Sequence, residues 1–471
     1  MRIPIFLFAV LLIQGCTGHT PISPPLPVAL PDRFAEQPEG FRLADPAAQW
    51  WRTFKDPQLD RLMDTLFAQN LELVQLSARL QQVQAATAIR HSARWPTLTG
   101  SADASRSQQP LPGGDFTGEA RRLSVAAAFE LDLWGRLAAL EKASDFERKA
   151  SQQDLMTLYL SLTARLGDLY FLAVEQREQL ALTDQLIASF ADTANRVEQR
   201  YRLGLVPAID LYQSRQSLAG ARAARQLYEA RLAEAEHAIN VLLGNYPGRA
   251  SARIPNQLPS APDLFAVGNP NDLIRHRPDL QAALHRVAAA DQGVAAAIAD
   301  RFPSLRFSGD YGDLHQDLTG GLVSGPFWSL LGILTQPIVD GGRRRAEVDR
   351  NQAVLKEAVA VYQQQVLTAF QDVEDALANN RATTQRIDHL VDTAEATAAT
   401  LRLATDRYLA GVDDYLPVLT AQRADFDSQS RLVAARRQLL TDRISLARAL
   451  GGSWMRDVMV ARQQMEKDSE P

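Results

Sequence analysis

The sequence predicts a mixed α and β membrane fold in which two internal repeats each combine very long helices with a pair of amphipathic β-strands. Three observations predict this fold. Four short motifs recur at a constant offset of 207 residues, and two segments without proline, 113–206 and 338–416, have the apolar spacing of packed helices. Parts of 97–133 and of 304–340 alternate between apolar and polar residues, as amphipathic strands do, although 327–339 is apolar on both faces.

The composition is that of a folded chain. The 471 residues suffice for about three domains or one elongated architecture. Hydrophobic residues make up 46% and charged residues 22%, which excludes disorder, and a net charge of −5 offers no basic excess for nucleic acid. The mean hydropathy of −0.19 excludes a bundle of membrane-spanning helices. Cys16 is the only cysteine, so no intrachain disulfide and no thiolate metal cluster can form.

The N-terminus has the pattern of a secretory signal peptide over residues 1–15. Arg2 precedes an apolar stretch over 3–13, and Gly15 is the small residue before the predicted cleavage site. About 11 apolar residues are too few to cross a bilayer of about 30 Å. Because Cys16 follows directly, this segment is either a plain signal peptide with an incidental cysteine or the start of a lipoprotein.

The segment around Cys16 resembles the bacterial lipobox. The resemblance implies a thioether-linked diacylglycerol and an N-terminal acyl chain on Cys16, and we expect no other cofactor. Thr17 in place of Asp implies the outer membrane. Seven prolines between residues 17 and 48 indicate that 16–49 forms an extended tether with little helix or sheet.

The constant offset divides the mature chain into two copies of one unit. The expected boundaries are 50–247 for the first repeat, 248–269 for a Pro-rich connector, 270–454 for the second repeat and 455–471 for a polar tail. The paired landmarks are Arg94-Trp95-Pro96 with Arg301-Phe302-Pro303, Gly135-Arg136 with Gly342-Arg343, Tyr201-Arg202-Leu203-Gly204 with Tyr408-Leu409-Ala410-Gly411, and Leu243-Gly244 with Leu450-Gly451.

The sequence patterns of the two repeats predict the same order of helices and strands. A helix of about 30 residues comes first, a strand–loop–strand unit follows, and a very long helix leads through a short turn into a closing helix. In order, these are 57–92 or 272–300, 97–133 or 304–340, 136–203 or 343–410, and the helices that end at Gly244 or Gly451.

The long helices are the most strongly patterned elements. Leu155, Leu158, Leu162, Leu166 and Leu169 follow the heptad-like steps that pack helix on helix. A helix of about 68 residues reaches about 100 Å, which no compact globule accommodates. An ordinary coiled-coil rod would show the same pattern.

The strands argue against a simple rod. Leu123, Val125 and Phe129 alternate with polar or small residues, and strand lengths of about 10 residues suit transmembrane β-strands. A water-soluble amphipathic hairpin is the alternative for these segments taken alone. Trp134, Trp328 and Tyr311 are candidates for interfacial aromatic belts.

Membrane insertion of these strands requires an oligomer. One chain supplies about four strands, and an open sheet cannot sit in lipid because its edge groups would lack hydrogen-bond partners. Two chains would give about 8 strands around a filled interior, whereas three would give about 12 strands with room for a pore.

From the Trp pair onward, the chain resembles the TolC/OprM family, the outer membrane factors of Gram-negative efflux and secretion systems, and most closely its NodT-like lipoprotein branch. The resemblance extends from Trp50 to Gly451 and depends on the order and spacing of several motifs. They are Trp50-Trp51 with Phe54 and Asp56-Pro57, Arg275-His276-Arg277-Pro278-Asp279, Phe129-Glu130-Leu131-Asp132-Leu133-Trp134-Gly135-Arg136, Phe302-Pro303, and Gln336-Pro337-Ile338-Val339-Asp340-Gly341-Gly342-Arg343.

The resemblance implies a homotrimeric channel-tunnel, in which a transmembrane β-barrel of about 12 strands continues into a long α-helical barrel. Its place would be the outer membrane of a Gram-negative cell, with the helices in the periplasm. It would serve as the passive outer-membrane duct of a tripartite RND-type efflux system, docked with a periplasmic adaptor and an inner-membrane pump. The alternatives are the duct of a type I protein secretion system and a lipid-anchored coiled-coil protein without a pore.

The resemblance also implies where the periplasmic end would close. Asp210 matches an acidic position used in such contacts and Tyr408 matches its usual tyrosine partner, while Pro417 and Thr420 stand where family members often carry Asp. Asp413 and Asp414 are the nearest acids in the second repeat.

Each of these acids would form a charged ring by threefold repetition, or would simply cap the following helix. Gly204 and Gly411 fit the two turns because glycine tolerates the backbone conformation that such turns need.

No enzyme signature appears in the sequence. The seven histidines show no HExxH spacing, and no P-loop, GxSxG or dinucleotide-binding motif is present. We therefore expect no catalytic residues and no metal ligands.

Overall fold

The computed structural model describes most of the chain as helices and one four-stranded sheet. Cys16 and the predicted signal peptide lie outside the described residues, as does most of the predicted polar tail. Its first residue, Met455, is described and is buried. The described residues are 19–22, 24–27, 31–37, 49–112, 114–249, 254–265, 267–318, 321–452, 454, 455 and 458.

The chain forms two compact units, each assembled from segments far apart in the sequence. The first contains Met1–Pro27, Ala78–Gln152 and Ala282–Gln365, and it holds the sheet. The second contains Val28–Ser77, Gln153–Gln281 and Val366–Pro471, and it is helical in its described part. Among the described residues, no helix combines the length and the apolar character that a membrane span requires.

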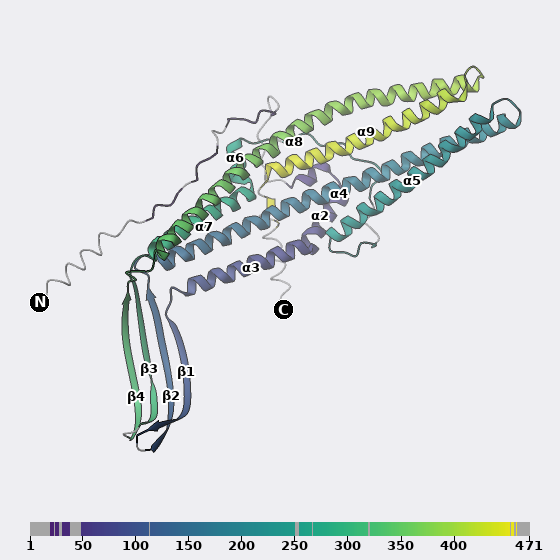
Figure 1. Cartoon of the computed structure of the whole chain (residues 1–471). Helices are drawn as coiled ribbons and strands as arrows, with labels where there is room; N and C mark the ends of the chain where they lie inside the picture. The colour runs from purple at the N-terminus through teal and green to yellow at the C-terminus, as the bar shows by residue number, and fades with distance from the viewer. Residues whose placement is uncertain are drawn as a thin grey trace. The chain divides into compact units, whose positions relative to one another are not determined.

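The sheet contains four antiparallel strands in the order of the sequence (Figure 1). They are β1 (Thr97–Leu111), β2 (Gly114–Leu131), β3 (Ser304–Leu318) and β4 (Gly321–Thr335). Each strand pairs with the next, so β1 and β4 each have one edge without a partner strand among the described residues. The structure thus confirms strands in both predicted segments, with lengths of 15 to 18 residues.

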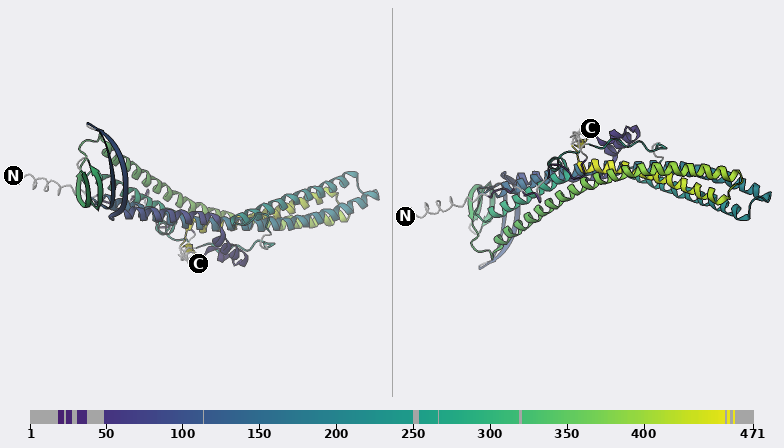
Figure 2. Two further views of the ribbon diagram at one scale, coloured as in Figure 1. Left: turned by 90° about the horizontal axis from the view of Figure 1, so that it is seen from below. Right: turned by 90° about the horizontal axis from the view of Figure 1, so that it is seen from above.

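The two faces of the sheet differ in exposure because the sheet is curved (Figure 2). Leu123 and Val125 are 65% and 53% exposed, whereas Ser124 between them is 4% exposed. Ser124 therefore marks the concave face and its apolar neighbours the convex face. The register pairs Ser124 with Gly312, where a Cβ atom would lie 2.2 Å from the carbonyl oxygen of Leu123. Only glycine permits this close approach of the two strands.

The predicted single helix over 57–92 is wrong, because two helices occupy it. They are α2 (Pro57–Gln69) and α3 (Leu71–Ser92), separated by Asn70. The Asn70 side chain accepts a hydrogen bond from the Leu73 amide at 2.9 Å and donates one to the Leu242 carbonyl at 2.7 Å. Asn70 therefore caps α3 and fastens the break to the end of α5 (Ala208–Leu242).

The predicted helix over 272–300 is also two helices, α6 (Pro270–His276) and α7 (Pro278–Ala299). Arg277 between them has an extended backbone, as the residue before a proline prefers. Its buried guanidinium donates to Asp279 at 2.7 Å and to Asp372 at 3.0 Å. The guanidinium also donates to the carbonyl oxygen of Ala449 at 3.3 Å, so one side chain joins three segments of the second unit.

Two helices of 67 residues each match the predicted long helices to within one residue. They are α4 (Arg136–Arg202) and α8 (Arg343–Leu409), and Figure 1 shows α5 beside α4 and α9 (Tyr415–Leu450) beside α8. The elements α3, β1, β2, α4 and α5 each have a counterpart that begins 207 residues later.

An aspartate caps the N-terminus of each long helix, which accounts for Asp132 and Asp340 in the motifs around Trp134 and Gly341. Asp132 accepts hydrogen bonds from the amides of Leu137 and Ala138 at 3.1 and 2.8 Å. Asp340 accepts from the amides of Gly342 and Arg344 at 3.2 and 3.4 Å. Both carboxylates satisfy amides that have no partner within the first helical turn.

The belt candidate Trp134 is only partly exposed and instead braces the junction of helix and strand in the first unit. Trp134 stacks on Phe302 with ring centroids 4.9 Å apart, and its indole donates to the Pro303 carbonyl at 2.8 Å. Trp328 and Tyr311 face each other across β4 and β3 and are 76% and 66% exposed. Both lie on the convex face, where an aromatic belt is expected.

The Trp pair that precedes α2 belongs to an aromatic core in the second unit. Trp51 packs edge-on against Trp454 with centroids 4.8 Å apart, and Phe54 packs against Phe171 at 5.0 Å. All four side chains are at most 5% exposed. This packing accounts for the aromatic spacing of the entry motif.

Candidate functional site at the helical turns

The turns from α4 to α5 and from α8 to α9 have the same backbone geometry. Gly204 and Gly411 both have φ +74°, a left-handed value that favours glycine. The Gly204 amide bonds to the Tyr201 carbonyl, and the next amide reaches back five residues, both at 2.9 Å. The Gly411 amide bonds to the Tyr408 carbonyl at 3.1 Å in the same pattern. Each glycine therefore ends its long helix with a Schellman motif.

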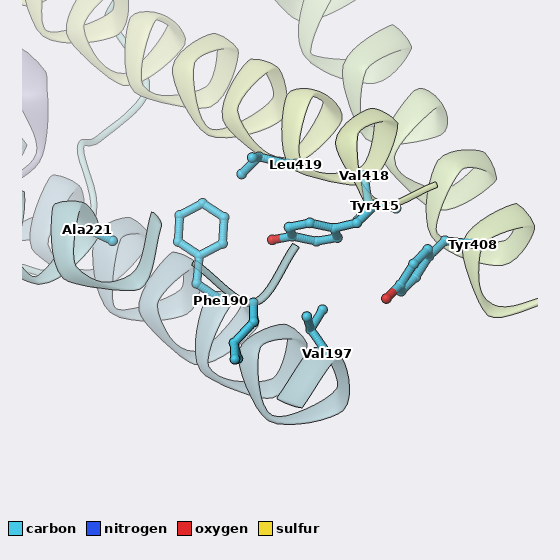
Figure 3. Packing of buried hydrophobic residues seen from close by; sticks show 8 residues of the cluster. Phe190, Val197, Ala221, Tyr408, Tyr415, Val418 and Leu419 are labelled. Carbon is cyan, nitrogen blue, oxygen red and sulfur yellow. The ribbon is translucent and has the colours of Figure 1, made fainter. Parts of the chain in front are cut away.

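A buried aromatic cluster lies directly behind these turns and draws on all four helices (Figure 3). Tyr408 at the end of α8 and Tyr415 at the start of α9 have ring centroids 5.8 Å apart. They are 4% and 0% exposed, and burial raises the pKa of Tyr415 to about 12. The cluster also includes Phe190, Val197, Leu211, Ala221, Val418 and Leu419.

Arg200 of α4 connects the two turns within one chain. Its guanidinium carbon lies 4.7 Å from the centroid of the Tyr408 ring, a cation–π contact. Its Nη1 donates to the Tyr408 carbonyl oxygen at 3.2 Å. One side chain of α4 thereby holds both the ring and the backbone at the end of α8.

Asp210 lies in the first turn of α5 and is 9% exposed. Burial raises the pKa of the Asp210 carboxyl, the negative charge of Asp414 adds to this rise, and Arg200 opposes it. Asp210 therefore interacts electrostatically with both Arg200 and Tyr408 within one chain.

The two acids of the second turn have different environments. Arg407 donates to both oxygens of Asp413, at 2.5 and 2.9 Å, and this ion pair lowers the pKa of the Asp413 carboxyl. Asp414 occupies the N-cap position of α9, yet its side chain makes no capping hydrogen bond. Asp413 is therefore neutralised within its own chain, whereas the exposed Asp414 has no ion-pair partner among the residues that the structure describes.

The positions that depart from the family pattern have ordinary structural roles. Pro417 lies in the first turn of α9, where a missing amide hydrogen breaks no helical hydrogen bond. The exposed Thr420 bonds to the Leu416 carbonyl at 2.9 Å. Neither residue contributes a charge to the turn.

Sequence reasoning missed Arg200 and Tyr415. The four tyrosines near the turns have similar sequence surroundings, but Tyr201 and Tyr212 are 42% and 68% exposed while Tyr408 and Tyr415 are buried. No signal in the single sequence separates these pairs, because their burial depends on contacts between helices more than 200 residues apart.

The tips of both turns expose apolar side chains. Leu203, Leu205 and Val412 are 74%, 64% and 63% exposed, and Leu416 is 57% exposed. Exposed apolar residues gathered at one end of a helical unit are typical of a contact surface.

No cluster of metal ligands is found in the part of the chain that the structure describes. No three His, Cys, Asp or Glu side chains among these residues come together as metal ligands would. Cys16, the predicted lipidation site, lies outside them.

The chain is similar to outer membrane proteins of efflux pumps over most of its length. The family model described as "outer membrane efflux protein" matches it twice, at residues 62–245 and 269–452. The solvent efflux pump outer membrane protein SrpC of Pseudomonas putida is 29% identical, with 95% of this chain and 97% of SrpC covered. The outer membrane protein OprJ of Pseudomonas aeruginosa is 32% identical, with 86% of each chain covered. The solved structure of the outer-membrane channel OprN superposes with a TM-score of 0.86 at 27% identity, covering 93% of this chain and all of that one.

Proposed function

The chain belongs to the outer membrane efflux protein family, and we propose that three copies form the passive outer-membrane duct of a tripartite RND-type efflux system. The observation that carries this proposal is a four-stranded sheet whose two edges have no partner strand in the described part of the chain, together with two helices of 67 residues. The proposal assigns no catalytic step to the protein and no coupling of energy.

Closure of the sheet requires other copies of the chain. In lipid, the free edges of β1 and β4 would leave backbone groups without partners, and pairing β4 of one copy with β1 of the next removes both edges. Three copies give a barrel of about 12 strands, wide enough for a water-filled lumen. The long helices of the three copies then continue the barrel as a periplasmic α-helical cylinder.

We propose that the chain is a tandem duplication with the boundaries 50–247 and 270–454, joined by 248–269. The double match of the family model and the recurrence of five elements at an offset of 207 residues support this division.

We further propose that Cys16 carries the diacylglycerol and N-acyl chain of a bacterial lipoprotein. The apolar stretch before Gly15 and the lack of any other cysteine support this assignment. Metabolic labelling with radioactive palmitate tests it. We expect label on the wild-type protein and none on Cys16→Ser, whereas label that persists in the variant would refute the anchor.

The turns behind the aromatic cluster are the proposed periplasmic gate. Threefold repetition would bring three copies of Asp210 and of Asp414 around one axis, where like charges repel. Arg200 and Tyr408 would hold each α8 against α4 and so resist the separation that opening requires.

We propose that the exposed turn tips dock with a periplasmic adaptor, which connects the duct to an inner-membrane pump. The apolar side chains of Leu203, Leu205 and Val412 support a protein contact there. The name of SrpC, a solvent efflux pump protein, favours small apolar molecules over polypeptides as cargo. A type I secretion duct is the alternative within the same architecture.

Gel migration tests the trimeric barrel. Purified protein should run near three chain masses in SDS without heating and as a single chain after boiling, because closed barrels resist the detergent. A lipid-anchored coiled-coil protein without a pore would run as a single chain in both lanes.

A further inference from the structure

The concave face of the sheet, which would line the lumen of the proposed barrel, carries charged side chains of which one has no partner among the described residues. Alternation places five charged strand residues on the same side as Ser124. They are Asp103 on β1, Arg122 and Glu130 on β2, and Arg306 and Asp310 on β3.

Two ion pairs account for four of these charges. Near the helical end of the sheet, Arg306 lies 3.3 Å from Glu130, which also accepts a hydrogen bond from Arg136 at the start of α4 at 2.5 Å. Farther along the strands, Arg122 donates to the Asp310 carboxylate, and its guanidinium carbon lies 4.7 Å from the Phe327 ring centroid on β4. The guanidinium is therefore fixed on the wall of the sheet between a carboxylate and an aromatic face.

Asp103 has no such partner. The register places it directly across from Arg122, yet Arg122 turns to Asp310 on the other neighbouring strand. Asp103 is exposed, and in the described part of the chain its carboxylate takes part in no hydrogen bond or ion pair. It is therefore the one charged strand residue on this face that has no partner in the part of the chain that the structure describes.

We propose that Asp103 makes the barrel selective for cations over anions. Arg122 limits the degree of this selectivity, because it neutralises the second carboxylate, Asp310. This inference rests on the proposed trimeric pore, in which three copies of Asp103 would form a negative ring in the lumen. The ring favours small cations over anions, because a unit charge at about 4 Å in water changes the local occupancy of an ion roughly fivefold. Organic cations belong to the same class of permeant solute.

Reversal potentials in planar bilayers under a salt gradient test the assignment with the purified full-length protein. Asp103→Asn should lower the cation-to-anion permeability ratio by roughly two- to fivefold. Arg122→Gln should raise the ratio, since it frees the Asp310 carboxylate. The difference between wild type and Asp103→Asn should shrink at about 1 M salt, where the Debye length falls to about 3 Å.

Asp313→Asn is the matched control. Asp313 pairs in register with Leu123, next to the level of Arg122, but on the convex face. Its replacement should leave the ratio unchanged. An unchanged ratio in Asp103→Asn, or an equal shift in Asp313→Asn, would overturn the assignment while the channel itself remains. Absence of any channel from the wild-type protein would instead overturn the proposed pore and this inference with it.

Discussion

Replacement of Arg200 by alanine should release the end of α8 from α4. The change removes a charged hydrogen bond to the Tyr408 carbonyl, worth about 1.5 to 3 kcal/mol, and a cation–π contact worth about 0.5 to 1 kcal/mol. Solvation of the freed carbonyl recovers part of this, so we expect a net loss of about 2 kcal/mol. If opening separates α4 from α8, the ratio of open to closed channels rises about 30-fold.

Single-channel recording in a planar bilayer measures that ratio as the fraction of time spent open. Arg202→Ala is the control two residues along α4, because Arg202 makes only an exposed ion pair with Glu198 at 2.6 Å. Such pairs contribute about 0 to 1 kcal/mol. An open fraction in Arg200→Ala equal to that of wild type, or a rise of the same size in Arg202→Ala, would refute the role given to Arg200.

Three further predictions concern pH, turn geometry and packing. Burial raises the pKa of the Asp210 carboxyl, so the closed arrangement that buries it is most stable below the ordinary carboxyl pKa of 3.8 and is weakened as the pH rises through the raised value. The fraction of open channels should therefore increase with pH in the wild type but not in Asp210→Asn. A pH dependence retained in the variant would contradict this. Gly204→Ala should cost about 1 to 2 kcal/mol of unfolding free energy in denaturant melts, because φ is +74° there, while Gly220→Ala, inside α5, should be neutral or stabilising. Arg277→Ala should cost about 1 to 3 kcal/mol, since it leaves the carbonyl oxygen of the buried Ala449 without its donor, while the Asp372 side chain is 40% exposed and solvated by water. A midpoint of urea unfolding no lower than that of the exposed-site variant Arg275→Ala would count against the packing described.

The periodic features of the sequence determined most of the fold. The absence of proline and the heptad-like spacing of apolar residues placed both long helices to within one residue of α4 and α8. Alternation identified β1, β2 and β3, whereas the apolar segment of β4 alternates poorly and was placed by the repeat. The breaks at Asn70 and Arg277 were harder to predict, because each depends on a tertiary contact, with Leu242 and with Ala449. A side chain that hydrogen-bonds to a distant helix produces no periodic pattern in the sequence.

The candidate site was predictable only in part. The two turn glycines follow from the repeat, and the structure places both in left-handed turns. The neutralisation of Asp413 by Arg407 and the role of Arg200 were not visible, because ion-pair partners depend on rotamers and on helix packing. Asp414 was considered as a helix cap, but it occupies that position without a capping hydrogen bond.

The central claim is that copies of this chain enclose a water-filled pore, and the conductance of the purified full-length protein in a planar bilayer tests it most directly. The account predicts discrete current steps of uniform size from material that migrates as an SDS-resistant trimer. A folded, SDS-resistant trimer that gives no current steps would contradict it.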